Sequence, residues 1–214
     1  MVADKLLIII GAGGHGKVAA ECAESMGIYQ KIVFLDAGAS ERTSVGPWDI
    51  VGMPEDFERY LSGNSEFFVA IGDNQARAKW LTGLDECKAP IASLIHASAT
   101  ISDYSTLGVG SLLCAHAVVN PFTSIGLGCI VNTSASIDHD CVLDNFVHIA
   151  PGCHIAGTVK VGEKSFIGIG SSVVQSVNIG KNCVLGAGSV VVGDIKDNSL
   201  GYGVPAKIIK TLEK

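Results

Sequence analysis

The chain has 214 residues, of which 26 are glycine and only 6% are aromatic, and its formal net charge is −6. With 48% hydrophobic and 17% charged residues, it is too apolar to be disordered. The negative charge argues against binding to a nucleic-acid backbone, and the length allows one large or two small domains. The core must therefore consist mainly of aliphatic and small side chains.

The apolar runs are too short to cross a membrane. The run from Leu6 to Ile10 follows Asp4, and it is shorter than a secretion signal or a membrane span. The cysteines number seven, which is odd, and none of them form a C-x-x-C pair, so we expect neither a disulfide framework nor a metal site. These features predict a cytoplasmic protein without membrane insertion.

The first ninety residues alternate short apolar runs with segments of helical spacing. The pattern predicts strands and helices in the order β-α-β-α-β, with strands over 5–10, 31–35 and 67–71 and helices over 18–26, 56–61 and 74–84. Gly27 is the expected C-terminal cap of the first helix. This order is typical of a small α/β domain with a parallel sheet.

A glycine-rich loop with the sequence GAGGHGK directly follows the first strand. Gly11, Gly13 and Gly16 match the dinucleotide pattern G-x-G-x-x-G, and Asp36 ends the second strand. The loop does not match the kinase-type P-loop pattern G-x-x-x-x-G-K-[ST], because Val18 stands where Ser or Thr must bind Mg²⁺. Under either pattern, glycines let a ligand approach the backbone, and the helix N-terminus offers N–H groups to an anion. The alternative is a tight turn without a ligand.

From residue 91 onward the sequence repeats every six residues. Every sixth residue from Ile95 to Val191 is Ile, Leu or Val, and the residue two places earlier is small. The residue one place later is often Gly, Asn or Asp, types that tolerate a positive φ at a corner. This period is typical of a hexapeptide β-helix, in which three hexads close one triangular coil.

Two sets of residues follow from this register. Six glycines occupy the position after the aliphatic residue, where we expect a positive φ: Gly108, Gly126, Gly162, Gly168, Gly180 and Gly186. Four cysteines occupy the small inward position and are expected to be buried: Cys129, Cys141, Cys153 and Cys183. The predicted organisation is an α/β domain over 1–90, a β-helix of about six coils over 91–192, and a C-terminal tail over 193–214.

The combination of this glycine loop, an acid ending the second strand, hexapeptide repeats, a His-acid pair and a late GVPAK sequence resembles the bacterial nucleotide-sugar acetyltransferases. The resemblance covers almost the whole chain. It implies a left-handed β-helix that transfers an acetyl group from acetyl-CoA to a nucleotide-linked 4-amino-4,6-dideoxy sugar. That sugar is UDP-linked in bacillosamine-type pathways and is GDP-perosamine in close relatives. The resemblance also implies a homotrimer with active sites between subunits.

His139 is the candidate general base, since imidazole titrates near neutral pH and the flanking Asp138 and Asp140 can support its cationic form. Asp140 stands where relatives often have Glu, and Asp138 is expected to be structural. Gly157 follows His139 by one coil of three hexads, so it is expected directly over the imidazole. By resemblance, its N–H stabilises the oxyanion, and His148 is a second active-site histidine.

The resemblance also assigns binding residues. For acetyl-CoA these are His148, Gly157, Ile169, Ala187, Pro205 and Ala206. For the nucleotide sugar they are Gly13, Gly14, His15, Asp36, Gly72, Asp73 and Asn74. From the residues alone, the last three are equally explained as a turn that caps a helix.

Two other functions remain open from the sequence. The same base could O-acetylate a sialic acid, or the chain could be a non-enzymatic protein that binds NAD or a nucleotide through the glycine loop. The sequence distinguishes neither an amine from a hydroxyl acceptor nor a UDP-linked from a GDP-linked sugar.

Overall fold

The computed structural model describes residues 5–61 and 63–213, and the chain divides into two compact units between Ala97 and Ser98. The first unit extends past the residue-90 boundary suggested by the hexad pattern. The reason is that Ile91 bridges Phe67 in parallel and the Ala92 N–H donates to the Phe67 carbonyl at 2.8 Å. No helix within the described residues is long and apolar enough to span a membrane.

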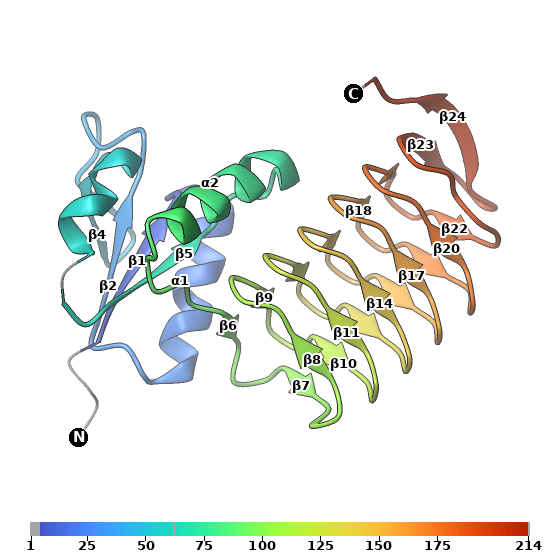
Figure 1. Ribbon diagram of the computed structural model, residues 1–214, viewed down its shortest axis with the longest axis horizontal. Helices are drawn as coiled ribbons and strands as arrows, with labels where there is room; N and C mark the ends of the chain where they lie inside the picture. Colours follow the sequence, from blue (N-terminus) through green and yellow to red (C-terminus); the bar gives the residue numbers. More distant parts are fainter. Residues whose placement is uncertain (1–4, 62, 214) are drawn as a thin grey trace. The chain divides into compact units, whose positions relative to one another are not determined.

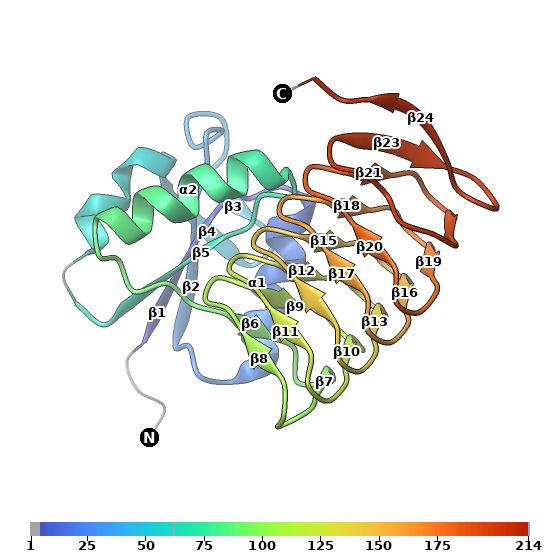
Figure 2. The same ribbon diagram turned by 45° about the vertical axis from the view of Figure 1, so that its right-hand side comes forward.

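The first unit, whose strands and helices are labelled in Figure 2, is built on a five-stranded sheet. The strand order in this sheet is β3-β4-β2-β1-β5. Its elements in chain order are β1 (Leu6–Ile10), α1 (Gly14–Met26), β2 (Lys31–Leu35), β3 (Ser44–Val45), β4 (Trp48–Gly52), the 3₁₀ helix η1 (Pro54–Tyr60), β5 (Ser65–Val69), α2 (Asn74–Glu86) and β6 (Leu94–Ile95). Strand β1 pairs in parallel with β2 and β5, and β2 pairs in parallel with β4. The predicted small α/β domain with a parallel sheet is confirmed.

Two local features differ from the prediction. The segment expected to be a helix over 56–61 is the 3₁₀ helix η1, which begins at Pro54 and is capped where Asp56 Oδ2 accepts the Met53 N–H at 2.8 Å. The edge hairpin of β3 and β4 is antiparallel and was not predicted. Strand β3 has only two residues, which is too short for an alternation of apolar and polar side chains to be recognised in the sequence. Gly27 is confirmed as the C-cap of α1, with φ 66°.

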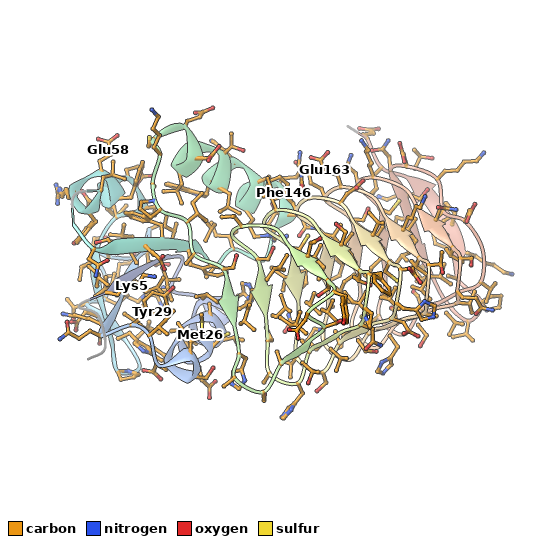
Figure 3. All side chains as sticks on the ribbon, turned by 60° about the horizontal axis from the view of Figure 1, so that its bottom comes forward. Lys5, Met26, Tyr29, Glu58, Phe146 and Glu163 are labelled. Carbon is orange, nitrogen blue, oxygen red and sulfur yellow. The ribbon has the colours of Figure 1, made fainter. Side chains whose placement is uncertain are left out.

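Strand β1 forms the centre of this unit. Leu7, Ile8 and Ile9 are completely buried, as expected for a parallel strand covered on both faces. At the amino end of β1, Lys5 and the Tyr29 hydroxyl each lie 2.7 Å from a Glu66 carboxylate oxygen, and Figure 3 shows Lys5 beside Tyr29. These contacts tie down the amino ends of the strands. The glycine loop lies at the carboxyl ends, where open α/β sheets bind ligands.

The second unit is a parallel β-helix whose two-residue strands stack in three faces (Figure 1). The first face contains β7 (Thr100–Ile101), β10 (Val118–Val119), β13 (Ser136–Ile137), β16 (His154–Ile155), β19 (Ser172–Val173) and β22 (Val190–Val191). The second contains β8 (Thr106–Leu107), β11 (Ser124–Ile125), β14 (Val142–Leu143), β17 (Lys160–Val161) and β20 (Asn178–Ile179). The third contains β9 (Leu112–Leu113), β12 (Ile130–Val131), β15 (His148–Ile149), β18 (Phe166–Ile167) and β21 (Val184–Leu185), continued by β23 (Ser199–Tyr202) and the antiparallel β24 (Lys207–Thr211).

The interior of the β-helix follows the hexad register. Cys129, Cys141, Cys153 and Cys183 are completely buried, as predicted, and their thiols are free. Each sulfur lies 3.0–3.2 Å from a main-chain carbonyl oxygen of the following segment. Burial raises the pKa of Cys141, Cys153 and Cys183. These thiols are therefore unreactive packing residues.

The expectation of a positive φ at the six corner glycines is wrong. In these six corners the positive φ occurs two residues after the glycine, for example at Gly110 (76°) after Gly108 and at Lys164 (60°) after Gly162. The glycines serve a different need, because a Cβ at any of the six positions would lie within 3 Å of an atom in the segment stacked above. On Gly162, for instance, a Cβ would lie 2.6 Å from the carbonyl carbon of Gly180. Close stacking of coils, rather than backbone conformation, selects glycine here.

Candidate functional site

His139 and Asp140 lie in the corner between β13 and β14. The left-handed conformation of Asp140 returns its carboxylate to the preceding residue, and Asp140 Oδ2 lies 2.8 Å from His139 Nδ1. Both side chains are more than half exposed. An ionised carboxylate can only accept a hydrogen bond, so Nδ1 carries a proton, and in the neutral ring Nε2 presents a lone pair. Asp140, although one methylene shorter than the Glu found in relatives, therefore reaches the imidazole and can orient it.

The surroundings of His139 favour its protonated form. The hydrogen bond to Asp140 raises the pKa of His139, the slight desolvation of the ring opposes this, and the negative charges of Asp138 and Asp140 raise it further. A base with a raised pKa holds a proton more firmly once it has accepted one. The corner therefore stabilises the protonated imidazole.

Gly157 lies against the His139 ring from the next coil, as the eighteen-residue spacing predicts. A Cβ on Gly157 would lie 2.6 Å from His139 Cε1 and 2.7 Å from Nε2, so the position has no room for a side chain. The Thr158 N–H donates to the His139 carbonyl at 2.9 Å and holds the two corners together. Within the described part of the chain, the Gly157 N–H donates no hydrogen bond. This N–H is therefore available to a ligand beside Nε2.

Asp138 and Asn120 support the same corner. Asp138 Oδ1 accepts the His139 N–H at 2.8 Å and the Asn120 amide at 3.0 Å. The sequence predicts a structural role for Asp138 and does not indicate a role for Asn120. The spacing of one coil between the two residues could have indicated the contact.

His148 lies on another face of the β-helix. It begins β15, which pairs with β12 and β18, whereas the His139 corner joins β13 to β14. Asn132 Nδ2 lies 3.2 Å from His148 Nε2, and the Phe166 ring packs edge-on against the imidazole at 5.1 Å between centroids. Within one chain the structure therefore brings together His139, Asp140 and Gly157 but not His148. The sequence pattern does not indicate this contact of Asn132.

Ile169 and Ala187 occupy the same corner position in successive coils. The Gly170 N–H donates to the Pro151 carbonyl at 2.9 Å, and the Gly188 N–H donates to the Ile169 carbonyl at 2.8 Å. In the described residues, by contrast, the N–H groups of Ile169 and Ala187 donate no hydrogen bond. This edge of the β-helix thus offers two main-chain donors, one coil apart, to a ligand.

Pro205 and Ala206 lie in the turn between β23 and β24. The Ala206 N–H donates to the Val190 carbonyl at 2.8 Å, and proline has no N–H. Pro205 and Ala206 therefore offer an apolar surface and no free main-chain donor of their own.

The glycine loop of the first unit leaves a helix N-terminus open. Helix α1 begins at Gly14, and its N-cap Gly13 supplies no side-chain cap. Both residues are exposed, with nothing within 4 Å of the place where a Cβ would stand. At Gly16, in contrast, a Cβ would collide with the Gly11 carbonyl oxygen. Gly16 is thus needed for the turn, whereas Gly13 and Gly14 leave space for a ligand.

Asp36 holds the glycine loop to the end of β2. Its Oδ2 accepts the Ala12 N–H at 2.7 Å, and its Oδ1 accepts the Gly38 N–H at 2.9 Å and Arg42 Nη2 at 2.8 Å. Burial alone would raise the pKa of Asp36, but the bonds from Arg42 and the two N–H groups lower it below the usual value. Asp36 therefore already has three protein donors, and Arg42 is a charged neighbour that sequence reasoning missed.

The turn at 72–74 is organised by a buried arginine. Asp73 caps α2, with its Oδ1 accepting the Ala76 N–H at 2.8 Å. Arg77, which is completely buried, donates to the Gly72 carbonyl at 3.2 Å and to Asn74 Oδ1 at 2.8 Å. Burial, with the Arg77 charge nearby, lowers the pKa of His15 to about 4. His15 is therefore neutral at pH 7. Nothing in the hydrophobic pattern of α2 distinguishes Arg77 from an exposed residue.

A parallel β-helix that presents a histidine-carboxylate pair at a corner is the arrangement of a hexapeptide-repeat acyltransferase. Residues 6–84 match the PglD N-terminal domain family, and residues 158–192 match the hexapeptide repeat of succinyl-transferase. No group of three or more His, Cys, Asp or Glu side chains in the described ranges is placed to hold a metal ion.

Solved structures match the chain along its length. The acetyltransferase domain of PglB from Neisseria gonorrhoeae, in complex with acetyl coenzyme A, is 40% identical, with a TM-score of 0.92 over 97% of this chain and 100% of that one. PerB from Caulobacter crescentus, in complex with CoA and GDP-perosamine, is 37% identical, with a TM-score of 0.88 over 98% and 100%. WeeI from Acinetobacter baumannii, at 24% identity and a TM-score of 0.86, shares the fold.

These matches give the class and then the family. The second unit is a left-handed β-helix of the acetyltransferase type. The chain belongs to the family of nucleotide-sugar N-acetyltransferases with a PglD-type N-terminal domain.

Proposed function

We propose that the protein transfers the acetyl group of acetyl-CoA to the 4-amino group of a nucleotide-linked 4-amino-4,6-dideoxy sugar. The observation that carries this proposal is the cluster of His139, Asp140 and Gly157 at one corner, with Nδ1 held by a carboxylate and Nε2 beside an available N–H. The first candidate is a UDP-linked sugar. The second is GDP-perosamine, because the PerB structure contains that sugar.

In this reaction His139 Nε2 accepts a proton from the sugar amine as the nitrogen attacks the thioester carbonyl. The C–N bond forms, the C–S bond breaks, and the proton passes from Nε2 to the leaving thiolate. The Gly157 N–H stabilises the oxyanion of the tetrahedral intermediate. Asp140 keeps Nδ1 protonated, so the imidazole presents its lone pair to the amine and is stabilised as a cation.

The two units supply different binding groups. The open N-terminus of α1 at Gly13, Gly14 and His15 suits a diphosphate, because its N–H groups and helix dipole favour an anion. In the second unit, the N–H groups of Ile169 and Ala187 suit the amide carbonyls of the pantetheine arm, and the turn at Pro205 and Ala206 suits the adenine. Asp36, Gly72, Asp73 and Asn74 would contact the nucleoside or sugar at the carboxyl ends of the strands.

His148 can join this reaction only through a second copy of the chain. It lies on the β15 face, away from the corner between β13 and β14. A homotrimer that brings the β15 face of one β-helix to the His139 corner of its neighbour would unite them. We include this trimer, with active sites between subunits, in the proposal.

A panel of acceptors tests the proposed substrate. We expect CoA release from acetyl-CoA with UDP-linked or GDP-linked 4-amino-4,6-dideoxy sugars, measured as free thiol, and a product that is heavier by one acetyl group. A sialic acid acceptor and NAD serve as controls for the two alternative functions. Acetylation of the sialic acid without acetylation of any amino sugar would contradict the proposal, as would NAD binding without acetyl-CoA binding.

The proposed CoA edge is tested by deleting a single N–H. Pro151 occupies the position of Ile169 one coil earlier, so Ile169→Pro removes the donor in a conformation that the fold accepts. Loss of one hydrogen bond is expected to raise the KM for acetyl-CoA about tenfold, with the KM for the nucleotide sugar unchanged. Ile169→Ala, which keeps the N–H, is the control. Equal KM values for acetyl-CoA in the two variants would exclude this donor.

A further inference from the structure

The corner that holds His139 has a second carboxylate, that of Asp138, in addition to the Asp140 carboxylate that binds the imidazole ring. Asp138 directs its Oδ1 to the main-chain N–H of His139, at 2.8 Å, while Asp140 binds the ring. The residues stacked on His139 from the adjacent coils, Pro121 and Gly157, carry no charge. His154, which lines a hollow together with Asp138, has its Nδ1 2.8 Å from Ser136 Oγ. The charges that act on the imidazole are thus those of the two aspartates.

The turn itself does not require a charge at this position. Asn132 stands at the equivalent place after β12, and its Oδ1 accepts the Thr133 N–H at 2.8 Å. This is the same distance as in the bond from the His139 N–H to Asp138. A neutral amide oxygen therefore accepts the N–H of the next residue at this type of corner as well as a carboxylate does. The negative charge of Asp138 is additional to what the fold needs.

The coil below holds that charge in place. Asn120 occupies the position of Asp138 one coil earlier and is followed by Pro121, which has no N–H. The Asn120 side chain therefore has no N–H to accept from the next residue, and its Nδ2 donates to Asp138 Oδ1 at 3.0 Å. The bonds from the His139 N–H and from Asn120 lower the pKa of Asp138. The carboxylate is thus fixed in orientation and kept ionised.

We propose that Asp138 is a positioning residue for the acetyl transfer, which fixes the main chain of His139 and supplies a second negative charge that stabilises the imidazole after it accepts the amine proton. The inference rests on the proposed function, in which His139 is the base. Asp140 selects the tautomer through direct contact. Asp138, held by Asn120, acts through the backbone and through its charge.

Asp138→Asn tests this role, because asparagine keeps the acceptor that closes the corner and removes the charge. Only neutral His139 accepts a proton, so kcat/KM rises as pH rises through the His139 pKa. Removing a nearby negative charge lowers that pKa, so the acidic limb moves to lower pH. The weaker base is expected to lower kcat on the plateau about fivefold, with both KM values unchanged. NMR titration of the His139 ring follows the same shift without requiring activity.

Asp144→Asn is the matched control. Asp144 stands at the equivalent position after β14, in a corner without a histidine, and its substitution is expected to change neither the pH profile nor the His139 titration. An unchanged His139 titration in Asp138→Asn, with His139→Ala inactive, would overturn the role of Asp138 and leave the proposed function standing. A fully active His139→Ala would instead overturn His139 as the base, and this inference with it.

Discussion

His139→Ala is expected to lower kcat about a thousandfold, because general-base catalysis by a positioned histidine contributes on the order of 10² to 10⁴ in rate. The ring is exposed and its neighbours are main-chain or charged groups, so its removal leaves no cavity in the core. The fold and the KM for each substrate should therefore be retained. The measurement is kcat from initial rates of thiol release, with circular dichroism to verify folding.

His116→Ala is the control for this substitution. His116 also lies in an exposed corner, with a positive φ like that of Asp140, and it has no assigned role. Its variant is expected to keep wild-type kcat. If His139→Ala retained the wild-type rate across the pH range, the amine would have to lose its proton to another group, and the proposed mechanism would fail.

Gly157→Ala is expected to reduce kcat by about two orders of magnitude. The new Cβ would lie 2.6 Å from Cε1 and 2.7 Å from Nε2 of His139, so the imidazole must leave its position. Because the ring is exposed, it can swing outward without disturbing the core, and the melting temperature should change little. The loss should therefore appear in kcat, because the base is displaced from the reacting atoms.

Gly193→Ala provides a matched control in the same corner column. Gly193 lies two coils beyond Gly157, and nothing stands within 4 Å of a Cβ built there. Activity is expected to be unchanged. Wild-type kcat in Gly157→Ala would mean that the His139 orientation seen here is not the one used in catalysis.

The repeat determined most of the second unit in advance. A period of six with one aliphatic and one small residue per hexad permits only a narrow triangular coil, and the coil length then places Gly157 over His139. The buried cysteines follow from the same register. The glycine-rich loop likewise predicted the strand-to-helix turn after β1. These inferences succeeded because they depend on local periodicity and on steric rules that act along the chain.

Other features depended on contacts that no local pattern contains. The six corner glycines were assigned to a positive φ, whereas the stacked coil above excludes their Cβ atoms. The sequence predicts that Asp36 faces the nucleotide sugar, but it contains no sign that Asp36 also accepts hydrogen bonds from Ala12, Gly38 and Arg42. Arg77 looked like any polar helix residue until the fold buried it beneath the turn at 72–74.

The sequence by itself determined the α/β unit, the β-helix, the His139 corner and the stacking of Gly157 on that corner, because a fixed period converts residue number into position. Only the tertiary structure decided that Asp140 reaches the imidazole, that Asn120 holds Asp138, and that His148 lies on a different face. Those facts depend on side-chain directions at corners and on atoms brought together from separate coils. Spacing along the chain orders the residues, but distances of about 3 Å are set only when the coils stack.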